Sequence, residues 1–330
     1  MNRRELILGA ATAMFTSAVL PGTVLAQDEQ AVSVHVITTA YRRLEGTTPS
    51  SELTEPVLAH LRMATRMRAE MADPRSARAM AAALSEVAGL AGWLYWDTDD
   101  LGSARRHYRL AVDYAQSAEE ALLTVYMLGS LASFVVYEGE TGEGLALIRH
   151  ATKTPMGQYP ATAQAWLASM EAVAYASADE EVATWRALDR AEAAAERIAR
   201  EDPLPWPWVF PFDARKIATH RLTCAVRLRR PDLAYAAADD LSMVTTGGHR
   251  KQGALVLLDL ACAHLQTGEV DQSLRVATAA VEFAVHTRSE RVLSRVRQFR
   301  RQVPVRAPQQ ALREFDERLR AATSRDRALQ

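Results

Sequence analysis

The chain has 330 residues, of which 48% are hydrophobic, and its 39 basic and 40 acidic residues leave a formal net charge of −1. This balance excludes a uniformly basic nucleic-acid-binding surface, although it is compatible with a local basic patch. The two cysteines, Cys224 and Cys262, are too few and too far apart for a disulfide framework or a cysteine zinc site. We therefore interpret both as small buried thiols.

The amino-terminal segment, residues 1–27, has the features of an export signal or an apolar linker. Arg3 and Arg4 precede an apolar run over residues 6–20, and a small-residue cleavage site ends at Ala26. The run is shorter than the about 20 residues that a stable membrane span needs. Two hypotheses follow: a twin-arginine export signal that is cleaved near Ala26, or a linker.

The remainder of the chain is predicted to be helical. Alanine, leucine, glutamate and arginine dominate it, and apolar residues recur at helical rather than at strand spacing. We divide it into amino-terminal helices over residues 28–74, helical repeats over 75–285 and carboxy-terminal capping helices over 286–330.

The start of the first repeat shows how local signals define a helix pair. Asp73 and Pro74 predict a helix N-cap followed by proline at the first helical position. We expect this helix to run from about residue 75 to 96, to break over the acidic residues 97–100, and to restart near Leu101.

A five-position pattern of alternating small and large residues recurs along the helical region, with shifts of 40 residues between the first three copies. Two antiparallel helices approach closely only where small residues face each other, so we predict that these positions form the seam within each pair. The copies are Gly92, Tyr95, Ala104, Tyr108 and Ala111; Ala132, Val135, Gly144, Ile148 and Ala151; Ala172, Tyr175, Thr184, Leu188 and Ala191; Leu222, Ala225, Ala234, Ala238 and Leu241; and Ala261, His264, Ser273, Ala277 and Ala280.

The first copy resembles a tetratricopeptide-type helix pair. It matches the glycine, tyrosine, alanine, aromatic and alanine positions of that family, whereas Ala88 replaces the leading tryptophan and Gln116 replaces the closing proline. The period of about 40 also exceeds the usual 34 residues. The resemblance implies an all-α fold, a right-handed superhelical solenoid of antiparallel helix pairs.

The order of segments over residues 31–322 is also similar to the carboxy-terminal repeat region of actinobacterial XRE-type transcriptional regulators. The matching segments are ITTAYRRLEGTTPSSELTEPVLAHLR, AGWLYWDTDDLGSARRHYRLA, ALDRAEAAAE, DPLPWPWVFPFD and ACAHLQTGEVDQSLRVATAAVE. In that family a helix-turn-helix domain precedes the repeats, and the repeats are thought to sense or bind a partner. Residues 1–30 do not resemble such a domain, so we expect no direct DNA binding by this chain.

The same resemblance bears on the location of the protein. Family members carry a similar arginine pair in an internal linker, which favours retention in the cytoplasm. Export after cleavage near Ala26 is the alternative.

We predict no catalytic, cofactor-binding or metal-binding residue, and therefore a protein that is not an enzyme. The sequence has no P-loop, nucleophile elbow or H-E-x-x-H motif, and its eight histidines are scattered. The arginine-rich stretch from Arg288 to Arg301 indicates a solvated capping helix, because glutamates dilute its charge. An enzyme assembled from scattered residues is the least favoured hypothesis.

The tetratricopeptide resemblance implies that a protein or peptide partner binds in a concave groove lined by the first helix of each pair. Large aromatic side chains off the seam are common anchors at such interfaces. The candidate groove residues are Trp93, Trp96, Asp97, Tyr126, Tyr137, Trp166, Lys216 and Arg227. Alternatively, longer helices or the PWPWVFPF sequence bury these aromatic residues.

Two functional hypotheses remain. The first is the sensor or interaction part of a transcriptional regulatory system, and the second is an exported repeat scaffold unrelated to transcription.

Overall fold

The computed structural model describes residues 23–155, 160–198, 212, 214–239, 250–304 and 309–327. Over these ranges the chain forms α-helices joined by short connections, and no strand is present. The predicted all-α class is therefore confirmed. The hypotheses about an export signal before residue 23 and about burial of aromatic residues by positions 205–211 lie outside the described residues.

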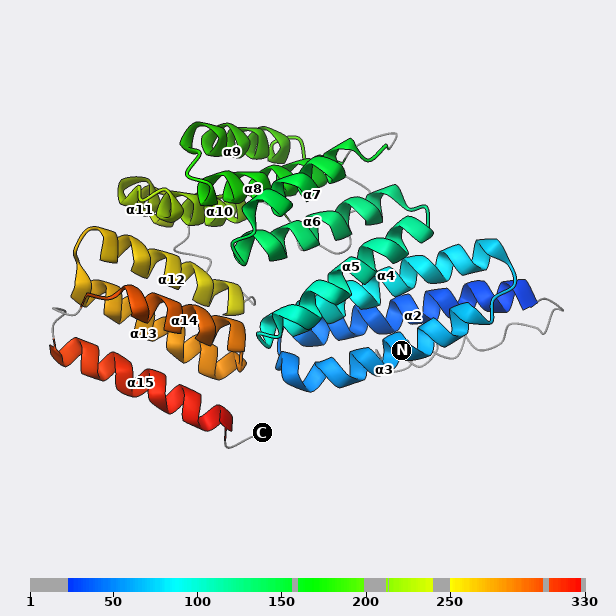
Figure 1. The fold of residues 1–330 in the computed structure, drawn as a ribbon, viewed down its shortest axis with the longest axis horizontal. Helices are drawn as coiled ribbons and strands as arrows, with labels where there is room; N and C mark the ends of the chain where they lie inside the picture. The colour runs from blue at the N-terminus through cyan, green and yellow to red at the C-terminus, as the bar shows by residue number, and fades with distance from the viewer. Residues whose placement is uncertain are drawn as a thin grey trace, which may run out of the picture.

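Figure 1 shows the helices in chain order. They are α2 (Thr23–Glu45), α3 (Ser50–Ala69), α4 (Pro74–Asp97), α5 (Leu101–Ser117), α6 (Ala121–Tyr137), α7 (Thr141–Lys153), α8 (Ala161–Ser177), α9 (Glu181–Ala195), α10 (Ala214–Arg227), α11 (Pro231–Asp239), α12 (Arg250–Gln266), α13 (Val270–Thr287), α14 (Glu290–Gln302) and α15 (Gln309–Arg327).

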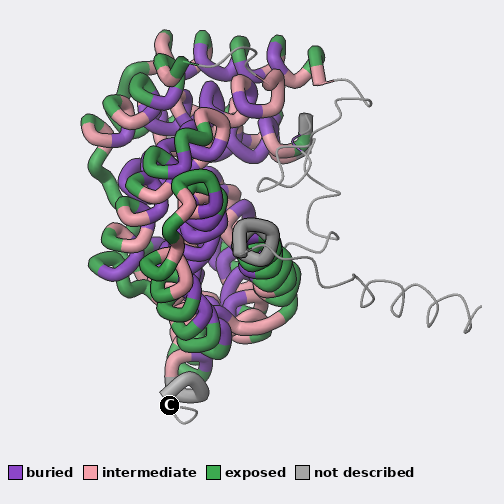
Figure 2. The backbone as a smooth tube through the Cα atoms, turned by 90° about the vertical axis from the view of Figure 1, so that its right-hand side faces the viewer, coloured by how far each residue is buried: buried purple, intermediate pink, exposed green. Residues whose placement is uncertain are grey.

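Consecutive helices pack as antiparallel pairs, and each pair stacks on the next (Figure 1). The consecutive pairs of the array are α4 with α5, α6 with α7, α8 with α9, α10 with α11 and α12 with α13. The first helices of neighbouring pairs also contact one another, from α4 through α6, α8, α10 and α12 to α14. We call the face that these first helices form the inner face. Figure 2 shows the buried residues along the faces where the helices meet.

The predicted start and end of the first helix of the array are confirmed. The side chain of Asp73 accepts a hydrogen bond from the backbone N–H of Ser76 at 2.8 Å, and Pro74 is the first helical residue. Proline costs no hydrogen bond there, because the first turn of a helix has no internal acceptor for its N–H groups. Helix α4 ends at Asp97 and α5 begins at Leu101.

In the first pair, the predicted seam lies between the two helices. Leu241 of the fourth predicted copy lies outside the described residues. Ala104 and Ala111 are fully buried, and Tyr108 is 3% exposed. A Cβ atom on Gly92 would lie 2.9 Å from Cγ of Tyr108, so glycine is what allows this ring to lie against α4. Tyr95 departs from the prediction, since it is only partly buried at the surface of the same core.

Each pair turns through one residue in the left-handed conformation. The amide of the residue that follows donates to a carbonyl five residues earlier, as Asp100 does to Tyr95 at 2.9 Å. This bond satisfies a carbonyl that the helix end would otherwise leave unpaired. The left-handed residues are Asp99, Gly139, Asp179, Arg229 and Gly268. The recurrence of this turn supplies structural evidence for the repeat, independent of side-chain pattern.

The two ends of the array contact each other. Helix α14 packs against α4, and Lys251 of α12 forms ion pairs with Glu45 at the end of α2 and Asp97 at the end of α4. The amino-terminal helices and the predicted carboxy-terminal capping helices therefore help to join the two ends. No helix in the described ranges is long and apolar enough to cross a bilayer.

Candidate functional site

Five side chains from four first helices converge on the inner face. Trp93 and Trp96 come from α4, Tyr137 from α6, Arg227 from α10 and Arg291 from α14. We call this group the arginine–aromatic cluster. Four of its members were predicted as groove residues, whereas Arg291 was assigned to a solvated helix. That assignment is wrong for Arg291, because its guanidinium lies on the aromatic rings of the inner face.

Trp96 is at the centre of the aromatic part of the cluster. Its ring centroid lies 5.7 Å from that of Trp93 and 5.6 Å from that of Phe134, both nearly edge to face. The indole N–H donates to Oε1 of Glu138 at 2.9 Å. Only 3% of Trp96 is exposed. The expectation that Trp96 is an open anchor is therefore wrong, and neighbours from α4, α6 and α14 bury it.

Arg291 covers the aromatic rings from the side of α14. Its guanidinium carbon lies 3.4 Å from the Trp96 ring centroid, 5.5 Å from that of Trp93 and 5.7 Å from that of Tyr137. Aromatic faces attract cations, and the planar guanidinium also stacks on them. Burial lowers the pKa of Arg291, although the nearby Asp97 carboxylate opposes that shift.

Arg227 approaches Tyr137 from α10. Its guanidinium carbon lies 4.9 Å from the ring centroid, and it donates a hydrogen bond to the hydroxyl of Ser177. Two arginines from helices far apart in sequence thus lie on one tyrosine. Burial raises the pKa of the Tyr137 phenol, and the positive charge of Arg227 partly offsets this effect.

Asp97, another predicted groove residue, is buried in a polar network that joins the chain ends. Its Oδ2 accepts from Ser50 Oγ at 2.6 Å and lies 2.8 Å from Lys251 Nζ. Its Oδ1 accepts from Ser289 Oγ at 2.6 Å. Lys251 also contacts Glu45 at 2.8 Å. We call these five residues the end-to-end network. Asp97 is 3% exposed, so the expectation that it faces a partner is wrong.

Within the end-to-end network, two carboxylates stabilise the positive charge of Lys251. Burial alone would lower the pKa of Lys251, but the carboxylates of Asp97 and Glu45 outweigh burial and raise it. A buried ammonium that contacts two carboxylates remains charged. Lys251 also donates to Ser50 Oγ at 3.0 Å, and Ser289 satisfies Oδ1 of Asp97, the oxygen that Lys251 does not contact. The network therefore has the character of a structural connection.

The remaining predicted groove residues lie elsewhere. Tyr126 and Trp166 pack on each other between α6 and α8, with ring centroids 5.6 Å apart. A Cβ atom on Gly129 would lie 2.3 Å from Trp166, so this glycine makes room for the indole ring. Lys216 donates to Gln252 between α10 and α12.

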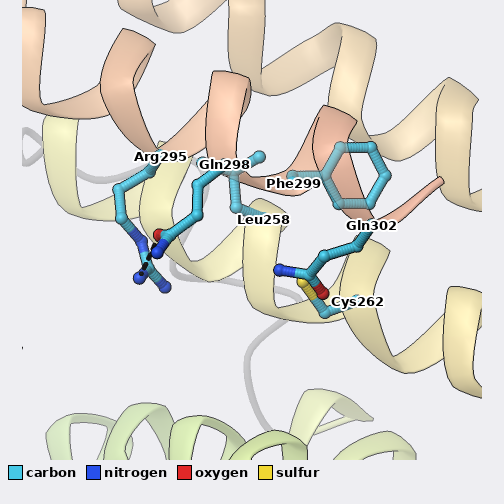
Figure 3. A pocket seen from close by; sticks show the side chains of 6 residues that line it. All are labelled: Leu258, Cys262, Arg295, Gln298, Phe299 and Gln302. Atoms are coloured by element: carbon cyan, nitrogen blue, oxygen red, sulfur yellow. Dashed lines mark hydrogen bonds between the residues drawn. The ribbon is translucent and has the colours of Figure 1, made fainter. Parts of the chain in front are cut away.

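A small hollow lies between α12 and α14. Arg295, Gln298, Phe299 and Gln302 face Leu258 and Cys262 across about 110 Å³ (Figure 3). Burial raises the pKa of Cys262 to about 12, so its thiol is protonated at neutral pH and is a poor nucleophile. On the far side of Arg295, Asp259 accepts from Thr223 Oγ1 at 2.6 Å and lies 3.9 Å from the Arg295 guanidinium.

The described residues of the cluster are aromatic and cationic groups, which suit binding contacts. In the described part of the chain, no three histidine, cysteine or acidic side chains are placed to hold a metal ion. His220 is buried with an unpartnered Nδ1, and burial lowers its pKa to about 3, so it is neutral at physiological pH. A histidine that stays neutral in this way does not alternate between acid and base, as general acid–base catalysis requires.

Sequence reasoning did not identify Arg291, Lys251 or Ser289. Periodicity places Arg291 on a basic helix, but it does not reveal that α14 folds back onto α4. The serine before Glu290 was a recognisable N-cap, and its hydroxyl does accept from Val292 N–H at 3.3 Å. Its second role, as a donor to Asp97, depends on the contact between the chain ends.

No protein-family model matches the chain, and a search of the curated proteins finds no match.

Proposed function

We propose that the protein is a non-catalytic, tetratricopeptide-like solenoid that binds a protein or peptide segment on its inner face. We further propose that it is the sensor or interaction part of an actinobacterial transcriptional regulatory system. The observation that carries the binding proposal is the convergence of Trp93, Tyr137, Arg227 and Arg291 from four different helices. Tryptophan, tyrosine and arginine are the residues most enriched among energetically dominant interface contacts.

The repeat geometry supports the solenoid part of this proposal. The seam positions have the small and large rhythm of tetratricopeptide pairs, and the left-handed turn residue recurs at 99, 139 and 179. Stacked repeats of this kind present an extended surface formed by corresponding helices. The regulatory part rests on the order of sequence segments over residues 31–322, which is similar to XRE-type regulators.

The binding proposal can be tested with random peptides displayed on phage and selected against the purified full chain. Selected peptides are then synthesised and their affinities measured by fluorescence anisotropy. We expect Trp93→Ala to weaken binding. Trp185→Ala is the matched control, because Trp185 is also half-buried but lies on α9, the second helix of its pair. Equal effects of the two substitutions would argue against an inner-face site.

The regulatory role and its alternative are separated by a second experiment. A bacterial two-hybrid assay against the helix-turn-helix proteins of the source organism should identify a specific partner. If the protein is instead an exported scaffold, mass spectrometry of the native protein should find a mature chain that starts at Gln27. We propose the cytoplasmic form, so that finding would reverse the proposal.

A further inference from the structure

Arg227 and Arg291 differ from the other half-buried arginines. Most of these pair with a carboxylate, and Arg42 and Arg68 donate to backbone carbonyls instead. The paired arginines are Arg105, Arg221, Arg230, Arg288, Arg295, Arg297 and Arg300. Within the described part of the chain, Arg227 has only the hydroxyl of Ser177 as an acceptor, and Arg291 has no hydrogen-bond acceptor at all.

An uncompensated guanidinium that is half-buried lowers the stability of a folded protein. Charges taken out of water are normally paired and hydrogen-bonded, because the cost of desolvation is otherwise not recovered. Two carboxylates close to the cluster are already engaged with other partners. Asp97 accepts from two serines and contacts Lys251, and Asp259 accepts from Thr223 and faces Arg295. The guanidinium groups of Arg227 and Arg291 therefore have N–H donors left to bind an anion.

We propose that Arg227 and Arg291 hold a carboxylate of an acidic peptide; this inference rests on the proposed peptide-binding function. The half-buried Trp93 provides the adjoining apolar contact. The two guanidinium carbons lie 4.9 and 5.7 Å from the same Tyr137 ring centroid, so both arginines lie beside one aromatic ring. Planar guanidinium groups bind carboxylates through two parallel hydrogen bonds, which the fork of an arginine matches. The aromatic rings hold the guanidinium planes in position and thereby reduce the ordering cost of binding.

The surrounding charges favour a peptide over a nucleic acid. Stacked aromatic and arginine side chains also bind single-stranded nucleic acids, through a cationic groove that follows many phosphates. Here Asp97 lies near Arg291, and Asp259 lies near Tyr137 and Arg295 on the same inner face. These carboxylates repel an extended polyanion, whereas a peptide with one or two acidic positions avoids them.

The test uses fluorescein-labelled hexaglutamate with an amidated carboxy terminus and hexaglutamine as its neutral match. Fluorescence anisotropy should show tighter binding of hexaglutamate, with an affinity that falls as salt rises. Arg227→Gln and Arg291→Gln should each weaken it by roughly tenfold, as for arginines at the centre of an interface. Arg318→Gln is the control, because Arg318 pairs with Glu282 on the exposed surface of α15 and α13. A triglutamine peptide with a free carboxy terminus distinguishes a terminal from a side-chain carboxylate as the source.

A stability measurement separates a ligand site from a structural contact. If the two arginines serve a ligand, the unliganded double variant Arg227→Gln and Arg291→Gln should be at least as stable as the parent protein, because two uncompensated charges are removed. A large loss of stability would show that they are structural, and would overturn the proposal.

Three binding results would also overturn it: equal affinity for hexaglutamate and hexaglutamine, unaltered hexaglutamate binding by the double variant, or tighter binding of an oligothymidylate of equal charge. In each case, phage-selected neutral peptides that still depend on Trp93 would leave the proposed peptide-binding function intact.

Discussion

At the scale of single residues, Trp96 is held by contacts from three helices. Its indole packs on Trp93 and Phe134, and Arg291 lies 3.4 Å above its ring centroid. We expect Trp96→Ala to lower the free energy of unfolding by about 3–5 kcal/mol, as for other buried aromatic residues. Urea unfolding followed by circular dichroism measures the difference. Trp96→Phe, which keeps an aromatic ring and loses the bond to Glu138, should cost less. A mild Trp96→Ala variant would mean that α14 does not cover this ring in solution.

His220 makes the stability of the protein sensitive to acid. Burial lowers its pKa to about 3, while an unfolded histidine titrates near 6.5. Below pH of about 6.5 the unfolded state binds a proton that the folded state does not, so stability falls with pH by about 1.4 kcal/mol per unit. The stability contributed by neutral, buried His220 is fully present above pH of about 6.5, and it is lost as the pH falls towards about 3.

The corresponding variant is His220→Phe, which keeps a ring against Phe212 and removes an unpartnered nitrogen. The free energies of unfolding of the parent and the variant should converge or cross above pH 7 and diverge in favour of the variant towards pH 4. Parallel curves over this range would show that His220 gains a proton partner in solution.

At the scale of helices, close approach along the seam depends on glycine at chosen positions. A Cβ atom at Gly92 would lie 2.9–3.1 Å from three ring atoms of Tyr108, whereas nothing lies within 4 Å of one at Gly253. Both glycines are inside helices, where alanine is intrinsically favoured by about 1 kcal/mol. We therefore expect Gly253→Ala to raise the free energy of unfolding. Gly92→Ala should lower it, because overpacking costs typically about 1–3 kcal/mol.

The opposite signs of these two substitutions provide an internal control, since the chemical change is identical. Thermal unfolding of the two variants in parallel with the parent protein gives the comparison. If Gly92→Ala is stabilising, α4 and α5 separate more easily than the Tyr108 contact suggests.

At the scale of the whole molecule, contact between the two ends alters how a repeat array opens. In a linear array each unit contacts only its neighbours, so the terminal units open most readily. Here Lys251 connects α12 to both α2 and α4, and Ser289 connects α14 to α4. The terminal helices are therefore protected by buried polar contacts that span more than 190 residues of sequence.

We predict that Lys251→Met increases amide hydrogen exchange in α2, α3 and α14 and leaves α6 and α8 unchanged. Removing the ammonium leaves Asp97 and Glu45 buried without their cation, which typically costs about 3–5 kcal/mol. Hydrogen exchange followed by mass spectrometry resolves the individual helices. Arg105→Gln is the control, because its partners Glu140 and Glu143 are local to the neighbouring pair. Exchange that rises evenly along the chain, or only in α12, would contradict an end-to-end connection.

Local patterns along the sequence were sufficient to predict the helical class, the cap at Asp73, the break after Asp97 and most of the buried seam. These features depend on residues within one or two turns of each other, or on small residues that must face one another for two helices to pack. The same reasoning correctly placed Tyr108 in the core at 3% exposure, whereas Tyr95, predicted at the same seam, is only partly buried.

Which non-seam residues remain accessible was decided only by the tertiary structure. Trp96 and Asp97 lie on the side of α4 that helical periodicity predicts to be open to solvent. Side chains of α14 and α12 nevertheless cover them. That placement depends on the summed rotation of many helix pairs, and small angles at each pair accumulate to bring residue 97 beside residues 251 and 289. A repeat pattern specifies each nearest-neighbour packing, but the meeting of the two ends results from all of these packings together, so no single stretch of sequence encodes it.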